Sequence, residues 1–189
     1  MKSEYLKRLM SADEMDLALD RIAAEIIERH PELAQTALVG IRRRGVPLAE
    51  ALRKEINRMS SCRLSVGVLD ITFYRDDLSL VATQPVVEAS NLDFDVSGKD
   101  VILVDDVLFT GRTTRAALDS VLDYGRPRRV ELAVLVDRGR RELPIQADYV
   151  GLQVETGPDE VVEVRVPSVD GEEGVYLATQ ELIRKIGSE

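Results

Sequence analysis

The chain has one cysteine, Cys62, among its 189 residues, which excludes a disulfide framework within it. No run approaches the roughly 18 consecutive apolar residues of a membrane-spanning helix. The first residues, MKSEYLKRLMSADE, lack the apolar core of a signal peptide. Together these absences predict a cytoplasmic protein that is neither exported nor inserted into a membrane.

Internal repeats, low-complexity tracts and linker-like segments are also missing. With 44% hydrophobic and 31% charged residues, the composition is that of an ordinary globular protein. A chain of this length can bury a sizeable core without metals or disulfides. We therefore predict a single domain over residues 1–189.

Basic residues are outnumbered by acidic ones, which gives the chain a net charge of −9. This argues against a protein that binds nucleic acid over its whole surface, since phosphate backbones require clustered Lys and Arg. The arginines are nevertheless clumped, at 42–44, 126–129 and 138–141. Basic pockets on an acidic body favour a small polyanionic ligand over a long one.

What the sequence does contain is an alternation of apolar strands and amphipathic helices. A capping box of Ser11 and Glu14 opens a helix predicted over residues 11–30, and His30 is predicted to cap its end. The further predicted elements are strands at 36–41, 64–73, 99–107 and 129–137, helices at 46–58 and 112–124, two short strands after residue 148, and a final helix or strand and helix in VYLATQELIRKI. This order predicts an α/β fold, a mainly parallel sheet flanked by helices.

Three predicted strand ends carry the most unusual residues of the chain, at 42–45, 105–114 and 137–141. In open parallel sheets, ligands bind beyond the carboxyl ends of the strands. The three segments therefore predict one binding site at that edge.

The stretch VILVDDVLFTGRTTRAALD, residues 101–119, contains the richest chemistry. Its TGRTT turn at a helix start brings backbone N–H groups, hydroxyls and the positive helix end to one point, which predicts a site for a terminal phosphate. Gly111 lets the backbone come close to the ligand. The Walker A and GxGxxG patterns are absent, which lowers the case for ATP hydrolysis or NAD binding.

Asp105 and Asp106 precede this turn at the end of the apolar strand. Their carboxylates are suited to sugar hydroxyls or to a divalent cation. A sugar phosphate therefore fits the stretch, with its sugar at the aspartates and its phosphate at the turn. The alternative is that Asp105 is a charge at a helix start and Asp106 a solvated turn residue, because carboxylates are common there.

Residues 101–113, VILVDDVLFTGRT, resemble the phosphoribosyl pyrophosphate motif of type I phosphoribosyltransferases. LVGIRRRG at 38–45, DITFYRDDLS at 70–79 and LAVLVDRGRRELPIQADYVG at 132–151 resemble the same family in the same order. The wording of residues 101–113 is most similar to the group that combines uracil phosphoribosyltransferase activity with regulation of pyrimidine operons. DRGRRELP together with YRDDL separates that group from the hypoxanthine, adenine and orotate transferases. The resemblance implies a single phosphoribosyltransferase domain with a small hood and a flexible hairpin loop.

The resemblance also implies roles for individual residues. Asp105 and Asp106 would hold the ribose hydroxyls, residues 110–114 the 5′-phosphate and residues 42–45 the pyrophosphate. The segment around Tyr74 would close over the site as a lid, and residues 136–139 would form part of the hood that holds uracil. The predicted catalytic residues are Arg44, Arg75, Asp105 and Asp106. The predicted substrate-binding residues are Arg43, Gly45, Val107, Leu108, Phe109, Thr110, Gly111, Arg112, Thr113, Thr114, Val136, Asp137, Arg138 and Gly139.

The implied cofactor is Mg²⁺, which would bridge pyrophosphate and ribose oxygens of the substrate. No residue is assigned as a direct metal ligand. Asp137 is predicted to contact the metal through a water molecule, or else only to order the hood.

The resemblance implies a second activity, transcription attenuation, in which UMP or UTP controls binding to a pyrimidine mRNA leader. The predicted RNA-binding residues are Arg21, Arg29, Arg140 and Arg141. An alternative is an RNA-binding regulator that keeps the nucleotide pocket with little or no turnover. The family also implies a homodimer or homotetramer.

Overall fold

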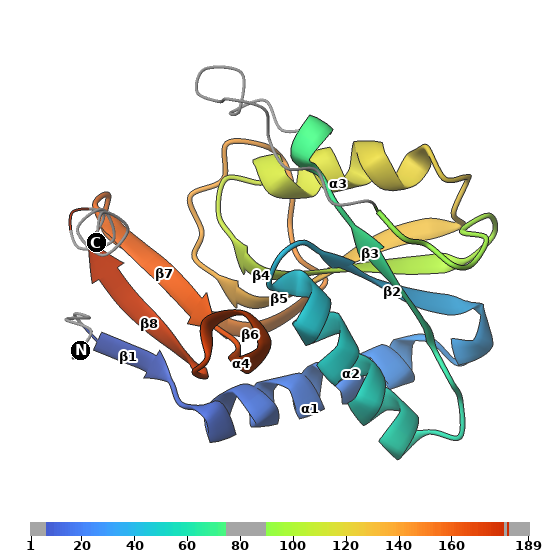
Figure 1. Cartoon of the computed structure of the whole chain (residues 1–189), viewed down its shortest axis with the longest axis horizontal. Coiled ribbons are helices and arrows are strands. Elements are labelled where there is room, and N and C mark those ends of the chain that lie inside the picture. The colour runs from blue at the N-terminus through green and yellow to red at the C-terminus, as the bar shows by residue number, and fades with distance from the viewer. Residues whose placement is uncertain (1–6, 75–89, 180, 182–189) are drawn as a thin grey trace.

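Five parallel strands form the central sheet of the computed structural model, which describes residues 7–74, 90–179 and 181 (Figure 1). Their order across the sheet is β3-β2-β4-β5-β6, and each neighbouring pair is parallel. The strands are β2 (Thr36–Ile41), β3 (Ser65–Leu69), β4 (Asp100–Leu108), β5 (Arg129–Asp137) and β6 (Tyr149–Gln153). Every residue of β2 is buried, as expected for a strand covered on both faces.

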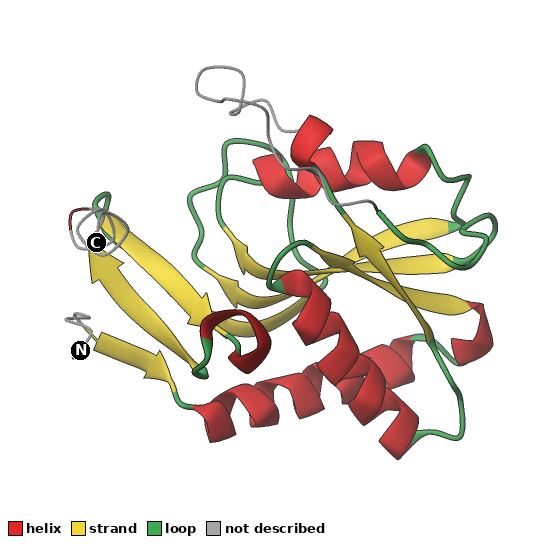
Figure 2. Ribbon diagram, in the orientation of Figure 1, coloured by secondary structure: helices red, strands yellow, loops and turns green. Residues whose placement is uncertain are grey.

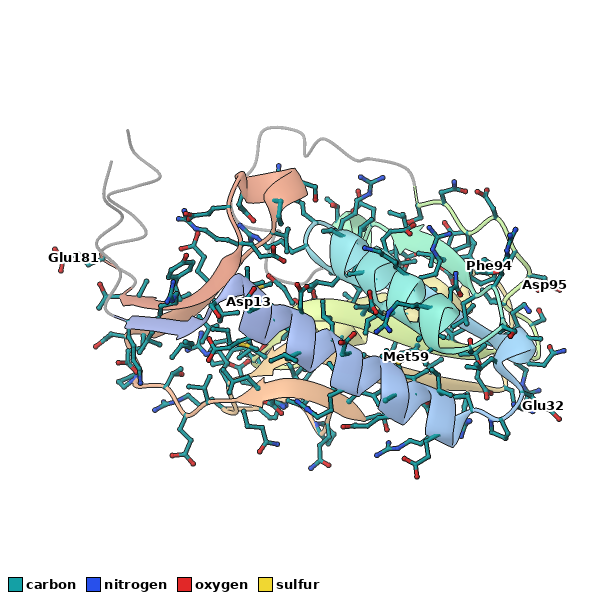
Figure 3. The ribbon with its side chains drawn as sticks, turned by 90° about the horizontal axis from the view of Figure 1, so that it is seen from below. Asp13, Glu32, Met59, Phe94, Asp95 and Glu181 are labelled. Atoms are coloured by element: carbon teal, nitrogen blue, oxygen red, sulfur yellow. The ribbon has the colours of Figure 1, made fainter. Side chains whose placement is uncertain are left out.

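Helices cover the two faces of this sheet (Figure 2). α1 (Ala12–Arg29) and α2 (Gly45–Met59) lie side by side on one face, with charged side chains turned outward (Figure 3), and α3 (Arg112–Leu122) lies on the other. The apolar residues accordingly form two buried clusters, one on each side of the sheet. The predicted α/β architecture is confirmed.

The predicted capping box at the start of α1 is present. Ser11 Oγ accepts the Glu14 N–H at 3.3 Å, and the Glu14 carboxylate accepts the Ser11 N–H at 2.7 Å. The backbone N–H of His30 closes the other end by donating to the Ile26 carbonyl at 3.0 Å. Both predicted ends of this helix are therefore confirmed.

A second, antiparallel sheet stands beyond the carboxyl ends of the central strands (Figure 1). It contains β1 (Lys7–Met10), β8 (Gly174–Thr179) and β7 (Glu160–Arg165), in the order β1-β8-β7, and the short helix α4 (Pro167–Asp170) joins β7 to β8. We call these four elements the hood. The sequence did not predict β1, and the start of VYLATQELIRKI is strand, with residues 182–189 outside the described residues.

The strand predicted over residues 64–73 is too long. β3 ends at Leu69 because Asp70 begins a local turn, in which its Oδ1 accepts the Thr72 N–H at 2.9 Å and the Thr72 hydroxyl at 2.5 Å. The short helix η2 (Thr72–Tyr74) follows, and η1 (Leu33–Gln35) precedes β2. In the part of the chain that the structure describes, no helix is both long and apolar enough to span a bilayer.

Candidate active site

The three segments predicted to form one site meet at the carboxyl edge of the central sheet. β4 lies between β2 and β5, with Gly40 paired to Val104 and Leu108 paired to Asp137. The turns that leave these strands therefore start beside one another. This placement follows from the parallel register alone, before any side chain is considered.

A cavity of about 320 Å³ lies at the turn after β4. It is lined by Val107, Leu108, Phe109, Thr110, Gly111, Arg112, Thr113, Thr114 and Glu142. Gly111 caps α3 with φ of 92°, in the left-handed region, and a Cβ there would lie 3.3 Å from the Ile145 side chain. A side chain is therefore disfavoured at this turn, and the first residues of α3 line the cavity, where the positive end of the helix favours negative charge.

The two aspartates lie within β4, so the interpretation of Asp105 as a charge at a helix start is wrong. Asp105 is buried, 7% exposed, and its Oδ1 accepts the Asp106 N–H at 2.9 Å. Asp106 is half-buried, and its Oδ1 accepts the Val107 N–H at 2.9 Å. Each carboxylate is thus held by the backbone N–H of the next residue, just before the residues that line the cavity begin at Val107.

The turn after β2 is packed tightly against β4. A Cβ on Gly45 would lie 2.2 Å from the Val104 carbonyl oxygen, so only glycine fits there. The preceding Arg42–Arg43 peptide bond is cis, and the Arg43 side chain is exposed. The backbone of the predicted pyrophosphate loop is therefore fixed by its contact with β4.

Arg44 binds a partner that sequence reasoning missed. Its Nε donates to Asp170 Oδ2 at 3.0 Å and its Nη2 donates to Oδ1 at 2.7 Å. This hydrogen bond raises the pKa of Arg44, and it also holds the pKa of Asp170 below its usual value. Asp170 lies 126 residues away, in α4 of the hood, and carries no local motif.

Asp137, at the end of β5, has both carboxylate oxygens engaged within its own loop. Oδ1 accepts the Gly139 N–H at 2.9 Å, and Oδ2 accepts from Arg141 Nη2 at 2.6 Å. Arg141 donates further to the carbonyls of Phe109, Gly139 and Ile145, at 2.9, 3.0 and 2.9 Å. These contacts show Asp137 ordering its own loop at the end of β5, outside the four elements of the hood, and they tie that loop to the turn after β4.

Arg138 is buried, 6% exposed, and burial lowers its pKa. Its guanidinium lies 3.8 Å from the centre of the Phe109 ring and donates to the Glu160 carbonyl at 2.7 Å and to Thr156 Oγ1 at 3.2 Å. The side chain joins the cavity to β7 of the hood, and the Phe109 ring is 38% exposed. Val136 is fully buried in β5, so of this predicted group only Asp137 and Gly139 have appreciable exposure.

The four predicted RNA-binding arginines all make intramolecular hydrogen bonds. Arg21 Nη2 donates to the carbonyls of Val150 and Gly151 in β6, at 3.1 and 2.6 Å. Arg29 donates to the Asp148 carbonyl at 3.3 Å, and Arg140 to the Thr156 carbonyl at 2.9 Å. Arg141 has the loop contacts given above. Their part in RNA binding stays a prediction.

The predicted lid begins at Tyr74, whose carbonyl accepts from Arg115 Nη2 at 3.0 Å and whose hydroxyl donates to Asp123. Arg75 and residues 76–84 lie outside the described residues. Within residues 7–74, 90–179 and 181, no three His, Cys, Asp or Glu side chains gather as a metal site.

These strand ends, the phosphate turn and the hood define the class of protein. Residues 7–170 match the sequence family described as the phosphoribosyl transferase domain, so the chain belongs to this family. Within it, the chain belongs with the proteins named bifunctional protein PyrR. It is 55% identical over 170 residues to the one from Pelotomaculum thermopropionicum, covering 90% of this chain and 94% of the relative. It is 54% identical over 177 residues to the one from Thermus aquaticus, covering 94% and 98%.

Solved structures agree on the fold. A hypoxanthine phosphoribosyl transferase of Trypanosoma cruzi superimposes with a TM-score of 0.76 at 15% identity, covering 100% of both chains. A hypoxanthine-guanine phosphoribosyltransferase of Bacillus anthracis gives 0.70 at 17% identity, covering 93% of this chain and 99% of that one. The type I phosphoribosyltransferase fold is confirmed.

Proposed function

We propose that the chain transfers the phosphoribosyl group of phosphoribosyl pyrophosphate to uracil, forming UMP and pyrophosphate. The observation that carries the proposal is the meeting of three parts at one sheet edge. These are the paired carboxylates of Asp105 and Asp106, the phosphate turn at residues 110–114 and the loop at residues 42–45. These three parts would hold, respectively, the ribose, the 5′-phosphate and the pyrophosphate of one substrate.

Displacement of pyrophosphate from C1′ passes through a cation-like ribose, so the site must stabilise a departing polyanion and exclude water. Arg44 serves the first need, because its planar guanidinium can contact phosphate oxygens in pairs. Asp105 and Asp106 orient the ribose through its hydroxyls. The amino end of α3 and the hydroxyls of Thr110, Thr113 and Thr114 hold the 5′-phosphate.

The family generally uses Mg²⁺ together with its phosphoribosyl substrate. Carboxylate oxygens are ligands that Mg²⁺ prefers, and the half-buried Asp106 directly precedes the residues that line the cavity. Asp137 is occupied by Gly139 and Arg141 and would reach the metal only through water. When bound, Mg²⁺ supplies positive charge that neutralises the leaving pyrophosphate.

The choice of uracil and of a second, RNA-directed activity is supported by the motifs and by the relatives. YRDDL and DRGRRELP resemble the uracil-specific group, and the relatives at about half identity carry the word bifunctional in their name. We propose that the second activity is UMP- or UTP-dependent binding of a pyrimidine mRNA leader by a homodimer or homotetramer. The regulator without turnover is less favoured, because the motif residues proposed for the ribose and the phosphate are all present in the sequence.

The deciding experiment mixes the protein, phosphoribosyl pyrophosphate and Mg²⁺ with uracil, orotate or hypoxanthine and measures the nucleotide formed. We expect UMP from uracil and little product from the other two bases. The matched control is Asp106→Asn, which keeps the side-chain shape and should lower kcat/KM on the order of a hundredfold. Failure of the wild-type protein to form UMP would overturn the proposed transfer.

The RNA activity is tested by a gel shift with a pyrimidine leader RNA, with and without UMP. We expect a complex that UMP strengthens and that weakens steeply with salt, because phosphate contacts release counterions. No shift at low salt in either condition would remove the regulatory activity. A shift by a protein that forms no UMP would favour the regulator without turnover.

A further inference from the structure

One ion pair joins the predicted pyrophosphate loop to the hood. Arg44 lies at the start of α2, and Asp170 lies at the end of α4, between β7 and β8. Asp170 Oδ2 accepts the Arg44 Nε–H at 3.0 Å and also the Val166 N–H at 2.9 Å. The Asp170 side chain is only 13% exposed. The carboxylate is therefore anchored in its own turn while it binds Arg44.

Arg44 is in turn anchored at its backbone. The next residue, Gly45, is pressed against the Val104 carbonyl, which leaves the loop no room to shift toward β4. With the backbone fixed by β4 and the guanidinium fixed by Asp170, the flexible side chain between them is restricted at both ends. An arginine normally loses considerable rotamer freedom when it binds an anion, and here much of that loss has already occurred.

The ion pair uses one side of the guanidinium. Asp170 occupies Nε and Nη2, and among the described residues no hydrogen bond is made by Nη1 of Arg44. A guanidinium has five N–H donors, so it can bind a carboxylate on one side and a phosphate oxygen on another. Asp170 therefore orients Arg44 without using all of its donors.

A second carboxylate near Arg44, that of Glu163, does not bind its guanidinium. Glu163 in β7 also lies close enough for its charge to raise the pKa of Arg44, after the larger effect of the Asp170 hydrogen bond. Its own ion pair, however, is with Arg165 at 3.2 Å. Glu163 thus supplies negative charge near Arg44 without holding its guanidinium.

We propose that Asp170 is a positioning residue of the hood, which holds Arg44 ready for the pyrophosphate group of the substrate. The inference rests on the proposed function, because it assigns Arg44 to that group. In the opposite arrangement, Asp170 would compete with pyrophosphate for Arg44 and its removal would strengthen binding. The two arrangements predict changes of opposite sign.

The test compares Asp170→Asn with Glu163→Gln in steady-state kinetics. For Asp170→Asn we expect KM for phosphoribosyl pyrophosphate to rise by about tenfold, the size of losing one charge-assisted contact, while KM for uracil stays within about twofold. Glu163→Gln removes an equal charge from the same hood and should leave the KM for phosphoribosyl pyrophosphate unchanged or slightly lower. An unchanged or lower KM in Asp170→Asn would overturn the inference.

A double-mutant cycle with Arg44→Lys separates positioning from general destabilisation. If Asp170 acts through Arg44, Asp170→Asn should have little further effect on that KM in the Arg44→Lys background. Equal effects in both backgrounds would contradict the inference. Should Asp170→Asn fail to fold, Asp170→Glu, which keeps the charge but moves it, must still raise the KM for phosphoribosyl pyrophosphate selectively.

The wild-type protein separates this inference from the proposed function. If it forms no UMP, the proposed transfer fails, and titration calorimetry of pyrophosphate with Mg²⁺ into the wild-type and Asp170→Asn proteins tests Asp170 by itself. Weaker binding by Asp170→Asn supports the positioning role there as well. Equal or tighter binding, or a wild-type protein that does not bind pyrophosphate, overturns it.

Discussion

Asp100 illustrates how much a single carboxylate can organise at the amino end of β4. It accepts two hydrogen bonds from Arg128 at 2.8 Å and one from Arg129 at 2.9 Å, and His30 Nδ1 lies 3.2 Å away. Its side chain is 2% exposed. The hydrogen bonds from Arg128, and then those from Arg129, hold the pKa of Asp100 far below its usual range, against the opposing effect of burial. His30, predicted only as a helix cap, has a buried ring in this network, with Nε2 2.6 Å from Glu131.

We expect Asp100→Asn to lower the free energy of unfolding at pH 7 by about 2 kcal/mol, a value reduced for the exposed outer sides of the two arginines. Because the folded-state pKa is depressed, the stabilisation is present above the unfolded-state pKa and is lost as the pH falls. The difference from wild type should therefore shrink below about pH 4. Urea unfolding at several pH values checks this. Asp159→Asn, at an exposed site, should behave like wild type.

At the scale of elements, α1 protects the edge strand β6, and α2 fixes the loop after β2 by its contact with β4. α1 covers the outer edge of β6, where Arg21 reaches two carbonyls of the strand. α2 begins against β4, where Gly45 permits close contact. An uncovered edge strand is a template for aggregation, so the arginine at this edge has a structural use.

Arg21→Gln should remove the hydrogen bonds to the carbonyls of Val150 and Gly151 and lower the free energy of unfolding by about 1 kcal/mol. Hydrogen exchange of the β6 amides should rise with it. Arg53→Gln, which loses only an exposed ion pair with Glu50, serves as the control and should have almost no effect. Weaker RNA binding by Arg21→Gln at unchanged stability would instead assign this arginine to RNA.

Gly45→Ala tests the contact between α2 and β4. A Cβ at 2.2 Å from the Val104 carbonyl cannot be accommodated without a backbone shift, so we expect a loss of about 2 kcal/mol in the free energy of unfolding. The displaced loop should also raise the KM for phosphoribosyl pyrophosphate. Thermal unfolding and steady-state kinetics measure the two effects. Unchanged values in both would show that the loop does not depend on this contact.

At the scale of the whole molecule, the proposed substrate would span the central sheet and the hood, whose apolar residues share one buried cluster. The central sheet supplies the carboxylates and the phosphate turn, while the hood reaches the site through Arg44–Asp170 and Arg138–Glu160. A ligand that binds across this edge should stabilise the folded chain as a unit. The acidic net charge of −9 opposes binding of a polyanion by charge alone, which is why we expect the substrate to bind together with Mg²⁺.

We expect phosphoribosyl pyrophosphate with Mg²⁺, at a hundredfold excess over its Kd, to stabilise the protein by about 2.7 kcal/mol. This corresponds to a rise in Tm of roughly 5 to 10 °C for a chain of this size. Thermal unfolding followed by fluorescence of an added dye or by circular dichroism gives the shift. With EDTA the shift should fall to a small part of this value, and Mg²⁺ alone is the control. An equal shift in EDTA would contradict the role proposed for the metal.

The sequence by itself determined the order of strands and helices and the place of the phosphate turn. Those features depend on residues close together in the chain: the apolar run of β4, the Ser11–Glu14 capping box and the TGRTT turn at α3. The placement of three motifs at one edge also followed, since parallel strands end on the same side. The strand predicted over residues 64–73 was too long because the local turn made by Asp70 and Thr72 was overlooked.

Only the tertiary structure decided which charged side chains meet. Arg44 and Asp170 are 126 residues apart, Arg21 and Gly151 are 130 apart, and His30 and Asp100 are 70 apart. No periodicity or turn chemistry connects such pairs, and an arginine looks the same in the sequence whether it faces solvent, a carbonyl or a phosphate. Local chemistry therefore predicted the ligand site, whereas long-range packing placed Asp170 against Arg44 and engaged Arg21 and Arg141 within the fold.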